Sequence, residues 1–316
     1  MMLHGVLTVD KPAGMTSHDV VDRIRRAARM RRVGHTGTLD PMATGVLPLC
    51  LGRATKIAQF LLAEDKEYEV EMLLGRVTDS QDITGRVVET RDVEAIDQAR
   101  VEEVFSRFVG PLMQVPPMVS AKHHRGRRLY ELARQGVVVE RPPRPVTIWR
   151  LELRSLRLPY VAFRVHCSKG TYIRTLCHDL GQVLGPGGVM SALVRTRCGS
   201  FTLEDAAPLS ELAGREAIQC RLRSMDEALS RYPAVVLQPG AARRVIQGQA
   251  IAREQLHSWD RPFETGQLVR LHDPGGRLFA LAEAGVDAEA LARPAGGRPV
   301  LQPVKVLAES SEIPLA

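Results

Sequence analysis

The sequence has no uninterrupted apolar run of about 18 residues, the length that a membrane-spanning helix requires. Its first residues, MMLHGVLTVDKPAG, contain neither a basic leader nor the long apolar core of a secretion signal. We therefore expect neither a membrane span nor a secretion signal.

Cysteine is scarce as well. The five cysteines are odd in number, widely spaced and never in a Cys-x-x-Cys pair: Cys50, Cys167, Cys177, Cys198 and Cys220. This usage argues against a disulfide framework and a zinc ribbon, and favours a reducing, cytoplasmic location. His123 and His124 are adjacent but lack further ligands at a metal-binding spacing, so no metal site is predicted.

What the chain does contain is typical of a globular protein that binds a polyanion. Its 316 residues fit two domains, and 44% hydrophobic and 25% charged residues allow a sizeable core. The net charge of +7 favours a partner rich in phosphate, although a basic balance alone is weak support.

The arginines and lysines gather in three segments. The first spans residues 23–32, the second residues 122–128 and the third residues 141–157. Each cluster taken alone fits a solvated surface as well as a phosphate contact. Because all three flank the motifs described below, we favour phosphate contact, including by Arg125, Arg127 and Arg128.

Hydrophobic periodicity predicts strands and helices mixed without a strict βα repeat, which favours an α+β fold. The main strands are expected at 3–10, 46–51, 68–74, 146–153 and 161–167, and the main helices at 17–28, 54–63, 93–108 and 172–184. Near residue 232 the pattern changes to short strand candidates separated by Gly and Pro. We predict a first domain at 1–230, a small mostly-β domain at 234–308 and a frayed tail at 309–316.

Two segments lack regular periodicity and are candidates for function. Residues 114–128 are rich in Pro, His and Arg, which indicates an exposed excursion, extending to about residue 145, that closes over a ligand. Residues 34–45, GHTGTLDPMATG, contain three glycines around Asp40, which is typical of a backbone that turns sharply or lets a ligand approach.

The segment GHTGTLDPMATGVLPLCLGRATK resembles the signature of the TruB family of bacterial tRNA pseudouridine synthases. Order and spacing agree from about residue 3 to about residue 200. The further matching stretches are DKP with Gly14, KEY at 66–68, VPPMVSA at 115–121, LYE and ARQG at 129–136, and CSKGTYIRT at 167–175. One departure, Lys122-His123-His124, falls in the excursion and leaves its RNA contacts open.

The resemblance implies a pseudouridine synthase fold, with a central mixed or antiparallel sheet flanked by helices, and a PUA-like RNA-binding domain at the C-terminus. It implies that Asp40 is the nucleophile and that Arg174 pairs with it. It also implies that Tyr68 stacks on a flipped base and that His35 lies near the vacated position. Tyr172 and Leu193 match positions that line the uracil site. Lys11 matches a motif lysine for which a structural role and a phosphate contact both stay open.

The implied reaction converts uridine to pseudouridine at position 55, in the T loop of tRNA. It breaks the bond from ribose to a uracil nitrogen and joins ribose to a ring carbon, so it requires no cofactor and no metal. Asp40, with an ordinary aspartate pKa of about 3.9, would be ionised and able to act as a nucleophile. Attack on the anomeric carbon, glycal formation and addition to the ring all remain open.

Two other interpretations compete with this one. The chain could be an RNA-binding or tRNA-folding protein in which modification is secondary, or a guide-RNA-dependent subunit. An intact set of Asp40, Tyr68 and Arg174 argues against the first, and the excursion at 114–128 against the second. We therefore expect the T arm of tRNA as the partner, without guide RNA or an obligate protein partner.

Overall fold

The structure is a computed structural model that describes residues 2–93, 95–118, 123–124, 127–128, 139–292 and 298–308. At 123–124 and 127–128 only the backbone is described. The chain forms two compact units. The large unit comprises Leu7–Leu49 and Gln59–Arg221, and the C-terminal unit comprises Met1–Val6, Cys50–Ala58 and Leu222–Ala316.

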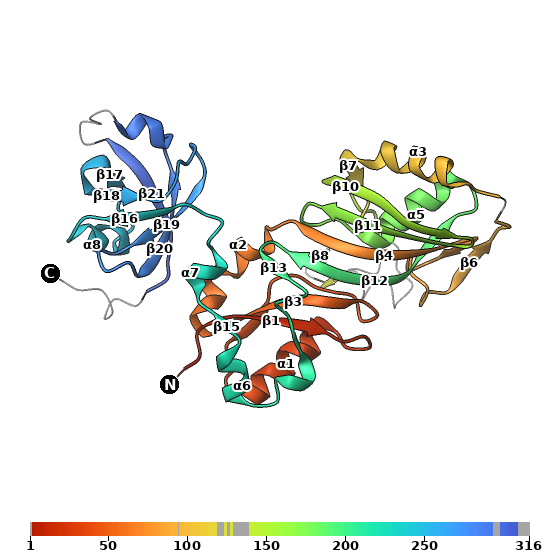
Figure 1. Cartoon of the computed structure of the whole chain (residues 1–316), viewed down its shortest axis with the longest axis horizontal. Helices are drawn as coiled ribbons and strands as arrows, with labels where there is room; N and C mark the ends of the chain where they lie inside the picture. Colours follow the sequence, from red (N-terminus) through yellow and green to blue (C-terminus); the bar gives the residue numbers. More distant parts are fainter. Residues whose placement is uncertain are drawn as a thin grey trace. The chain divides into compact units, whose positions relative to one another are not determined.

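Within the described residues, a mixed sheet has eleven strands, most of which lie in the large unit (Figure 1). Along the main path they are β14 (Ala207–Pro208), β1 (Gly5–Lys11), β3 (Thr44–Leu51), β12 (Gly188–Cys198), β4 (Lys66–Leu74), β11 (Tyr160–Cys167), β10 (Arg144–Arg157) and β7 (Gly110–Gln114). Three more strands lie beside this path: β2 (Val33–His35) on β3, β13 (Phe201–Thr202) on β12 and β15 (Leu222–Arg223) on β1. The predicted α+β class with a mixed sheet is confirmed.

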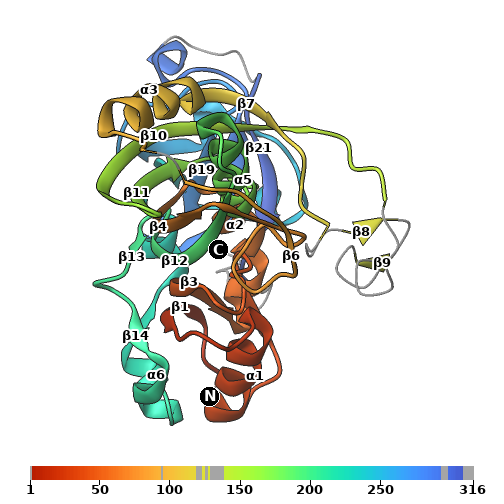
Figure 2. The same ribbon diagram turned by 90° about the vertical axis from the view of Figure 1, so that its right-hand side faces the viewer.

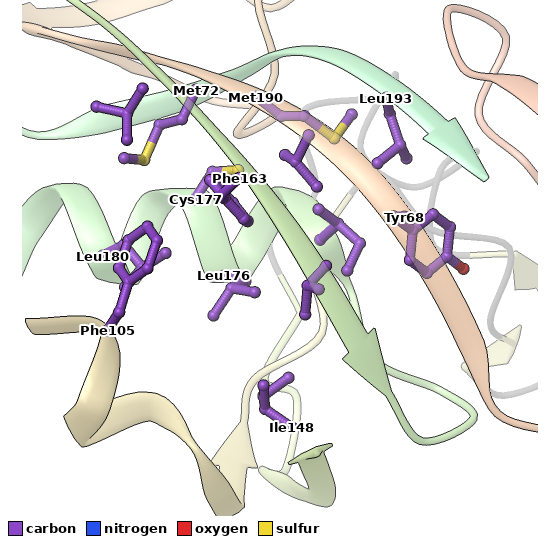
Figure 3. Packing of buried hydrophobic residues seen from close by; sticks show 14 of the residues in the cluster. Tyr68, Met72, Phe105, Ile148, Phe163, Leu176, Cys177, Leu180, Met190 and Leu193 are labelled. Atoms are coloured by element: carbon purple, nitrogen blue, oxygen red, sulfur yellow. The ribbon is translucent and has the colours of Figure 1, made fainter. Parts of the chain in front are cut away.

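Two helices cover one face of this sheet. They are α3 (Gln98–Phe108), which contacts β10, and α5 (Ile173–Leu184), which contacts β12. The core between them and the sheet includes Phe105 and Phe163, whose rings meet edge to face at 5.4 Å. Figure 3 shows this cluster, with Phe105 and Leu180 at one end.

The remaining elements of the large unit are short, apart from α1. They are α1 (Ser17–Ala28), α2 (Ala58–Leu62), β5 (Arg76–Thr78), β6 (Val87–Thr90), β8 (His123–His124), β9 (Arg127–Arg128), the 3-10 helix η2 (Leu209–Glu211) and α6 (Arg215–Cys220). The 3-10 helix η1 (Gly52–Ile57) belongs to the C-terminal unit. Helix α1 lies beside α6 (Figure 2), and Arg215 Nη1 donates to the Ala28 carbonyl at 2.9 Å.

A second sheet of six strands forms the C-terminal unit among the described residues, as the predicted small β domain requires. In sheet order they are β17 (Ile251–Ala252), β21 (Pro299–Val306), β20 (Leu278–Ala284), β19 (Leu268–His272), β16 (Ala234–Leu237) and β18 (Leu256–Trp259). The helices of this unit are α7 (Met225–Ala228), α8 (Ala241–Ile246), η3 (Arg253–Gln255) and η4 (Ala288–Ala292).

The last stretch of the C-terminal unit begins at Leu222, whereas the sequence pattern changes near residue 232. The reason is local bonding. Asp226 on α7 pairs with Arg270 and His272 of β19, which ties this helix to the second sheet. Lys56 Nζ donates to the carbonyls of Val306, at 3.3 Å, and Leu307, at 2.9 Å, which joins the segment Cys50–Ala58 to the end of β21.

None of the helices among the described residues combines the length and the apolar character that crossing a membrane would require.

Candidate active site

The loop that carries Asp40 connects β2 to β3 and is held from several sides. Thr16 is the N-cap of α1, in a capping box with Asp19, and Ser17 lies inside the helix. The buried Ser17 hydroxyl is therefore available to the loop. Its oxygen accepts from the Leu39 amide at 2.8 Å and lies 3.2 Å from the Leu39 carbonyl, to which it donates.

A second anchor holds the residue after Asp40. The carbonyl of Pro41 accepts from the Gly14 amide at 2.8 Å and from Lys11 Nζ at 3.2 Å. Lys11 also donates to the carbonyls of Pro12, at 2.8 Å, and Met15, at 2.6 Å. Asp40 thus lies between Leu39, whose backbone is bonded to Ser17 in α1, and Pro41, whose carbonyl is bonded to the segment before α1.

Lys11 itself is completely buried, with 0% of its surface exposed. Burial lowers the pKa of its ammonium to about 8, although the nearby Asp40 carboxylate opposes this shift. The expected contact with substrate or phosphate does not fit this position, because protein carbonyls enclose the ammonium. Of the two roles open from the sequence, these bonds favour the structural one.

The Asp40 carboxylate and the Arg174 guanidinium form a two-point pair, as expected from the sequence. Arg174 Nη2 donates to Asp40 Oδ1 at 3.1 Å, and Arg174 Nε lies 3.0 Å from Asp40 Oδ2. Arg174 sits in the first turn of α5 with only 6% of its side chain exposed, whereas Asp40 retains 30%. A planar guanidinium with two parallel bonds fixes the rotation of a carboxylate as well as its place. One part of the Asp40 side chain stays open to a ligand.

A second carboxylate, which we did not predict from the sequence, lies on the other side of Arg174. Asp82 Oδ2 is 3.6 Å from Arg174 Nη1, and the same nitrogen donates to the Ser80 carbonyl at 3.1 Å. Asp82 also accepts from the Ser80 hydroxyl at 2.8 Å and from the Thr84 hydroxyl at 2.6 Å. Arg174 is therefore held on both sides, and its orientation does not depend on Asp40 alone.

The surroundings of Asp40 change its acidity in opposing directions. Burial raises the pKa of its carboxyl, the Arg174 guanidinium opposes this, and the negative charge of Asp82 adds to the rise. The net direction is upward, so Asp40 takes up a proton more readily than an ordinary aspartate does. The carboxylate is correspondingly a better base and nucleophile when it is ionised.

Tyr68 and Leu193 lie on neighbouring strands at one end of the core cluster (Figure 3). They are 8% and 6% exposed, and the loop residues Leu39 and Ala43 belong to the same cluster. The loop that carries Asp40 and the strand that carries Tyr68 therefore share one packed core. Burial raises the pKa of the Tyr68 hydroxyl, which keeps the phenol protonated at neutral pH.

His35 and Tyr172 lie at the ends of two elements next to the site. His35 closes β2, and its Nδ1 accepts from the Gly37 amide at 3.3 Å. Burial, then the charge of Arg195, lowers the pKa of His35, so its ring is neutral at pH 7. Tyr172 is the N-cap residue of α5, two residues before Arg174, and Gln114 bonds its backbone amide at 2.7 Å and its carbonyl at 3.0 Å.

The basic clusters differ in how they are placed. Arg23, Arg26, Arg29 and Arg31 are exposed at the end of α1, and a hollow there is lined by Arg25, Arg26, Arg29, Met30 and Arg31. In the third cluster, Arg150 and Arg154 instead form ion pairs with Glu152. Arg125 lies outside the described residues, and of Arg127 and Arg128 only the backbone, paired with His124 and His123, is described.

No three His, Cys, Asp or Glu side chains gather into a group that could hold a metal ion in the part of the chain that the structure describes.

Comparison with known proteins gives consistent matches along the chain. The profile of the TruB family pseudouridylate synthase N-terminal domain matches residues 25–173, and that of the tRNA pseudouridylate synthase B C-terminal domain matches residues 174–231. A protein of Pelotomaculum thermopropionicum named tRNA pseudouridine synthase B is 45% identical over 90% of this chain and 92% of its own. A protein of Syntrophus aciditrophicus with the same name is 42% identical over 96% of this chain and 98% of its own.

Among solved structures, the fold is similar to a chain in an H/ACA RNP bound to a substrate RNA containing 2'-deoxyuridine. The identity is 27%, the TM-score is 0.77, and the match covers 99% of this chain and 87% of that one. A chain in a Cbf5-Nop10-Gar1 complex is similar at 28% identity and a TM-score of 0.77, over 98% of this chain and 86% of that one. Both sequence and fold therefore lead to one assignment: the chain belongs to the TruB family of pseudouridylate synthases.

Proposed function

We propose that this protein is a tRNA pseudouridine synthase that isomerises the uridine at position 55 of the T loop, with Asp40 as the reacting carboxylate. The relatives named tRNA pseudouridine synthase B support the reaction and the substrate class. The observation that carries the proposal is the two-point pair of Asp40 with Arg174, which presents one partly exposed carboxylate from an otherwise buried loop.

One carboxylate is sufficient for the chemistry. The bond between the ribose anomeric carbon and the uracil nitrogen breaks, and the base turns. The anomeric carbon then bonds to carbon 5 of the ring, which bears a hydrogen. That hydrogen leaves as a proton and the ring nitrogen gains one, so no external donor, acceptor or redox partner is consumed. Asp40 serves as a covalent nucleophile or as a base, and Arg174 holds it in place for either step.

The target uridine has to leave its stack before Asp40 can reach it, at a free-energy cost of a few kcal/mol. Stacking of a base on an aromatic ring is worth about 1–3 kcal/mol, so a contact with Tyr68 would offset much of this cost. Leu193 and Tyr172 would complete the wall of the uracil site. His35, neutral at pH 7, would lie near the position that the base leaves.

RNA contacts would extend beyond the reacting nucleotide. We assign phosphate contacts to the exposed arginines at the end of α1 and, by resemblance, to Arg125, Arg127 and Arg128. The C-terminal β domain would bind RNA as a PUA-like domain does. We also propose that the protein acts in the cytoplasm, without guide RNA or a protein partner, in contrast to the assemblies in which its structural relatives were solved.

The test is the variant Asp40→Asn, which keeps the shape of the side chain and removes its charge. We expect it to abolish tritium release from tRNA labelled at carbon 5 of uracil, while tRNA binding changes little. Asp92→Asn, at an exposed position, is the matched control for loss of one negative charge and should react like the unchanged protein. Full turnover by Asp40→Asn would refute the assignment of the reacting group.

A protein that mainly folds tRNA is the second candidate, and the same preparations distinguish it. In that case Asp40→Asn would keep the ability to refold a destabilised tRNA, and the unchanged chain would release no tritium. Release of tritium by the purified chain alone, with tRNA as the only added macromolecule, supports the stand-alone enzyme. A requirement for an added protein or RNA would contradict it.

A further inference from the structure

A buried arginine lies in the middle of the sheet, next to the loop that carries Asp40. Arg195 on β12 is 1% exposed and is among the largest fully buried side chains described. Its backbone pairs with Gly45 of β3 on one side and with Tyr68 of β4 on the other. Arg195 thus separates the strand that ends the loop from the strand that carries the aromatic ring.

The guanidinium of Arg195 bonds both ends of the loop. Its Nε donates to the Val46 carbonyl at 2.6 Å, and its Nη2 donates to the Gly37 carbonyl at 3.3 Å. Val46 follows the loop on β3 and Gly37 precedes Asp40 by three residues. On the neighbouring strand, Tyr68 is the register partner of Arg195. One rigid, planar group therefore fixes both stems of the loop, from a strand paired with the one that carries the ring.

The neighbouring backbone is fitted closely to this residue. A Cβ atom added to Gly45, whose φ is 98°, would lie 2.3 Å from the Arg195 carbonyl oxygen. Any side chain there would separate β3 from β12, and the Val46 carbonyl would move with its strand. The close approach at Gly45 and the bond to Val46 thus both belong to the contact between β3 and β12.

A charge in this place needs a reason, because burying a guanidinium is unfavourable and an apolar residue of similar size would fill the core at least as well. In the part of the chain described, no carboxylate forms an ion pair with Arg195. Its positive charge instead lowers the pKa of His35 and opposes the rise in the pKa of Tyr68. Its two hydrogen bonds both go to the loop that carries Asp40.

We propose that Arg195 is a positioning residue, which sets the geometry of the Asp40 loop relative to Tyr68 by joining the Gly37 and Val46 carbonyls from a strand position paired with Tyr68. This inference rests on the proposed function of the site. Arg195 touches neither Asp40 nor the place of the reacting bond, so its effect passes through the backbone of the loop. A displacement of about 1 Å in a reacting group can slow a reaction about 100-fold, which is the scale expected here.

The experiment compares Arg195→Met with Arg195→Lys, under single-turnover conditions with saturating enzyme. We expect Arg195→Met to release tritium about 100-fold more slowly, with a tRNA dissociation constant within about threefold of the unchanged protein. Arg195→Lys keeps the charge but lacks the planar fork that reaches two carbonyls. Its rate should therefore fall between those of Arg195→Met and the unchanged protein. If Arg195→Met does not fold, the loss in Arg195→Lys alone decides, and a rate equal to that of the unchanged protein overturns the proposal.

The matched control is Arg270→Met, in the C-terminal unit. Arg270 is 8% exposed and its Nε donates to the Tyr232 carbonyl at 2.8 Å, so it is also a buried arginine bonded to backbone. It should lower the melting temperature without slowing tritium release from bound tRNA. An equal loss of rate in both variants at equal melting temperature would reduce Arg195 to a stabilising residue and refute the proposal.

A second measurement needs no activity and separates this inference from the proposed function. Burial is the main cause of the lowered pKa of His35, and the charges of Arg195 on β12 and His18 on α1 lower it further. The His35 signal, identified with His35→Asn, should titrate at higher pH in Arg195→Met than in the unchanged protein. An unmoved titration would contradict the placement of Arg195 beside the loop. If instead the unchanged protein releases no tritium, the proposed function fails and this titration still stands.

Discussion

Arg174 is the residue on which two acidic side chains converge, and its position determines how Asp40 responds to pH. Asp40 and Asp82 lie on opposite sides of one guanidinium, at 3.0 Å and 3.6 Å. Because one cation serves two anions, neither carboxylate receives its whole charge. Burial is the main cause of the raised pKa of Asp40, and the charge of Asp82 adds to the rise against the effect of Arg174. A residue that contacts no substrate thus adjusts the reacting one.

Replacing Asp82 by Asn tests this sharing. The negative charge of Asp82 raises the pKa of Asp40, so its removal should lower that pKa and move the acid limb of the pH–rate profile to lower pH. The measurement is the single-turnover rate of tritium release across the acid range.

Asp79→Asn is the control, because Asp79 is exposed on the same turn and is not among the charges that act on Asp40. It should leave the acid limb in place. An acid limb that stays unchanged in Asp82→Asn, or moves to higher pH, would show that Asp82 does not act on Asp40 through charge.

At the scale of elements, the Asp40 loop is fixed by α1 as much as by its own strands. The Ser17 hydroxyl satisfies both backbone groups of Leu39, and Ser17 is 2% exposed. Leu39 is itself 3% exposed, so its amide has no access to water if that hydroxyl is removed. These two bonds satisfy buried backbone groups of a loop that lacks regular hydrogen bonding, and they anchor the loop to α1.

Ser17→Ala should destabilise the fold by about 1–3 kcal/mol, the usual effect of leaving a buried backbone donor unsatisfied. Because the two hydrogen bonds of Ser17 adjoin Asp40, tritium release should also slow. Thr16→Ala is the matched control: it removes the cap of the same helix, at about 1 kcal/mol, and leaves Leu39 bonded. Urea unfolding and single-turnover rates measure both effects, and equal rates in the two variants would contradict a role for Ser17 in holding the loop.

The sequence predicts the elements that carry strong periodicity and the residues that carry a motif. Tyr68 alternates with charged residues on β4, and its inward side is correct. The pair of Asp40 with Arg174 could be expected only from resemblance, since 134 positions separate the two residues. Strand β12 was missed because its arginines and threonine interrupt any alternation of apolar and polar residues.

Arg195 and Asp82 were missed for a related reason. The sequence indicates exposed side chains at both positions, because one is an arginine in a strand and the other an aspartate in a Ser-Gln-Asp-Ile-Thr-Gly turn. Only the packing of several strands buries them. A turn in which Ser, Asp and Thr recur at alternate positions is the one local signal that could have identified Asp82, because such side chains bond to each other.

For the whole molecule, the net charge of +7 is less informative than its distribution. Many arginines are paired with acidic neighbours, as Arg100 and Arg107 are with Glu103 on α3. The end of α1 instead exposes several arginines around one hollow. Such a surface suits phosphate groups spaced along an RNA strand.

Replacing Arg26, Arg29 and Arg31 together by Gln should weaken tRNA binding and flatten its salt dependence. The log–log slope should fall by roughly 0.7–0.9 for each phosphate that the variant no longer neutralises. Replacing Arg125, Arg127 and Arg128 by Ala is predicted to act in the same direction. The measurement is the dissociation constant between about 50 and 200 mM salt.

Arg100→Gln with Arg107→Gln, which removes paired arginines from α3, is the control and should leave the slope unchanged. A slope that stays constant in the α1 variant would exclude that surface from the RNA interface.

Strand β12 has a further consequence for how this chain tolerates change. It pairs with β3 at Gly45 and with β4 at Tyr68, and Met190 bonds the backbone of the turn that contains Asp82. Side chains alternate between the two faces of a strand, so one inserted or deleted residue before Leu193 would reverse Leu193 and Arg195 together. Insertions at the outer strands β7 or β14 would leave these contacts in register. We therefore expect substitutions at most positions of β12 to be tolerated better than insertions or deletions, because the latter change the length of the strand.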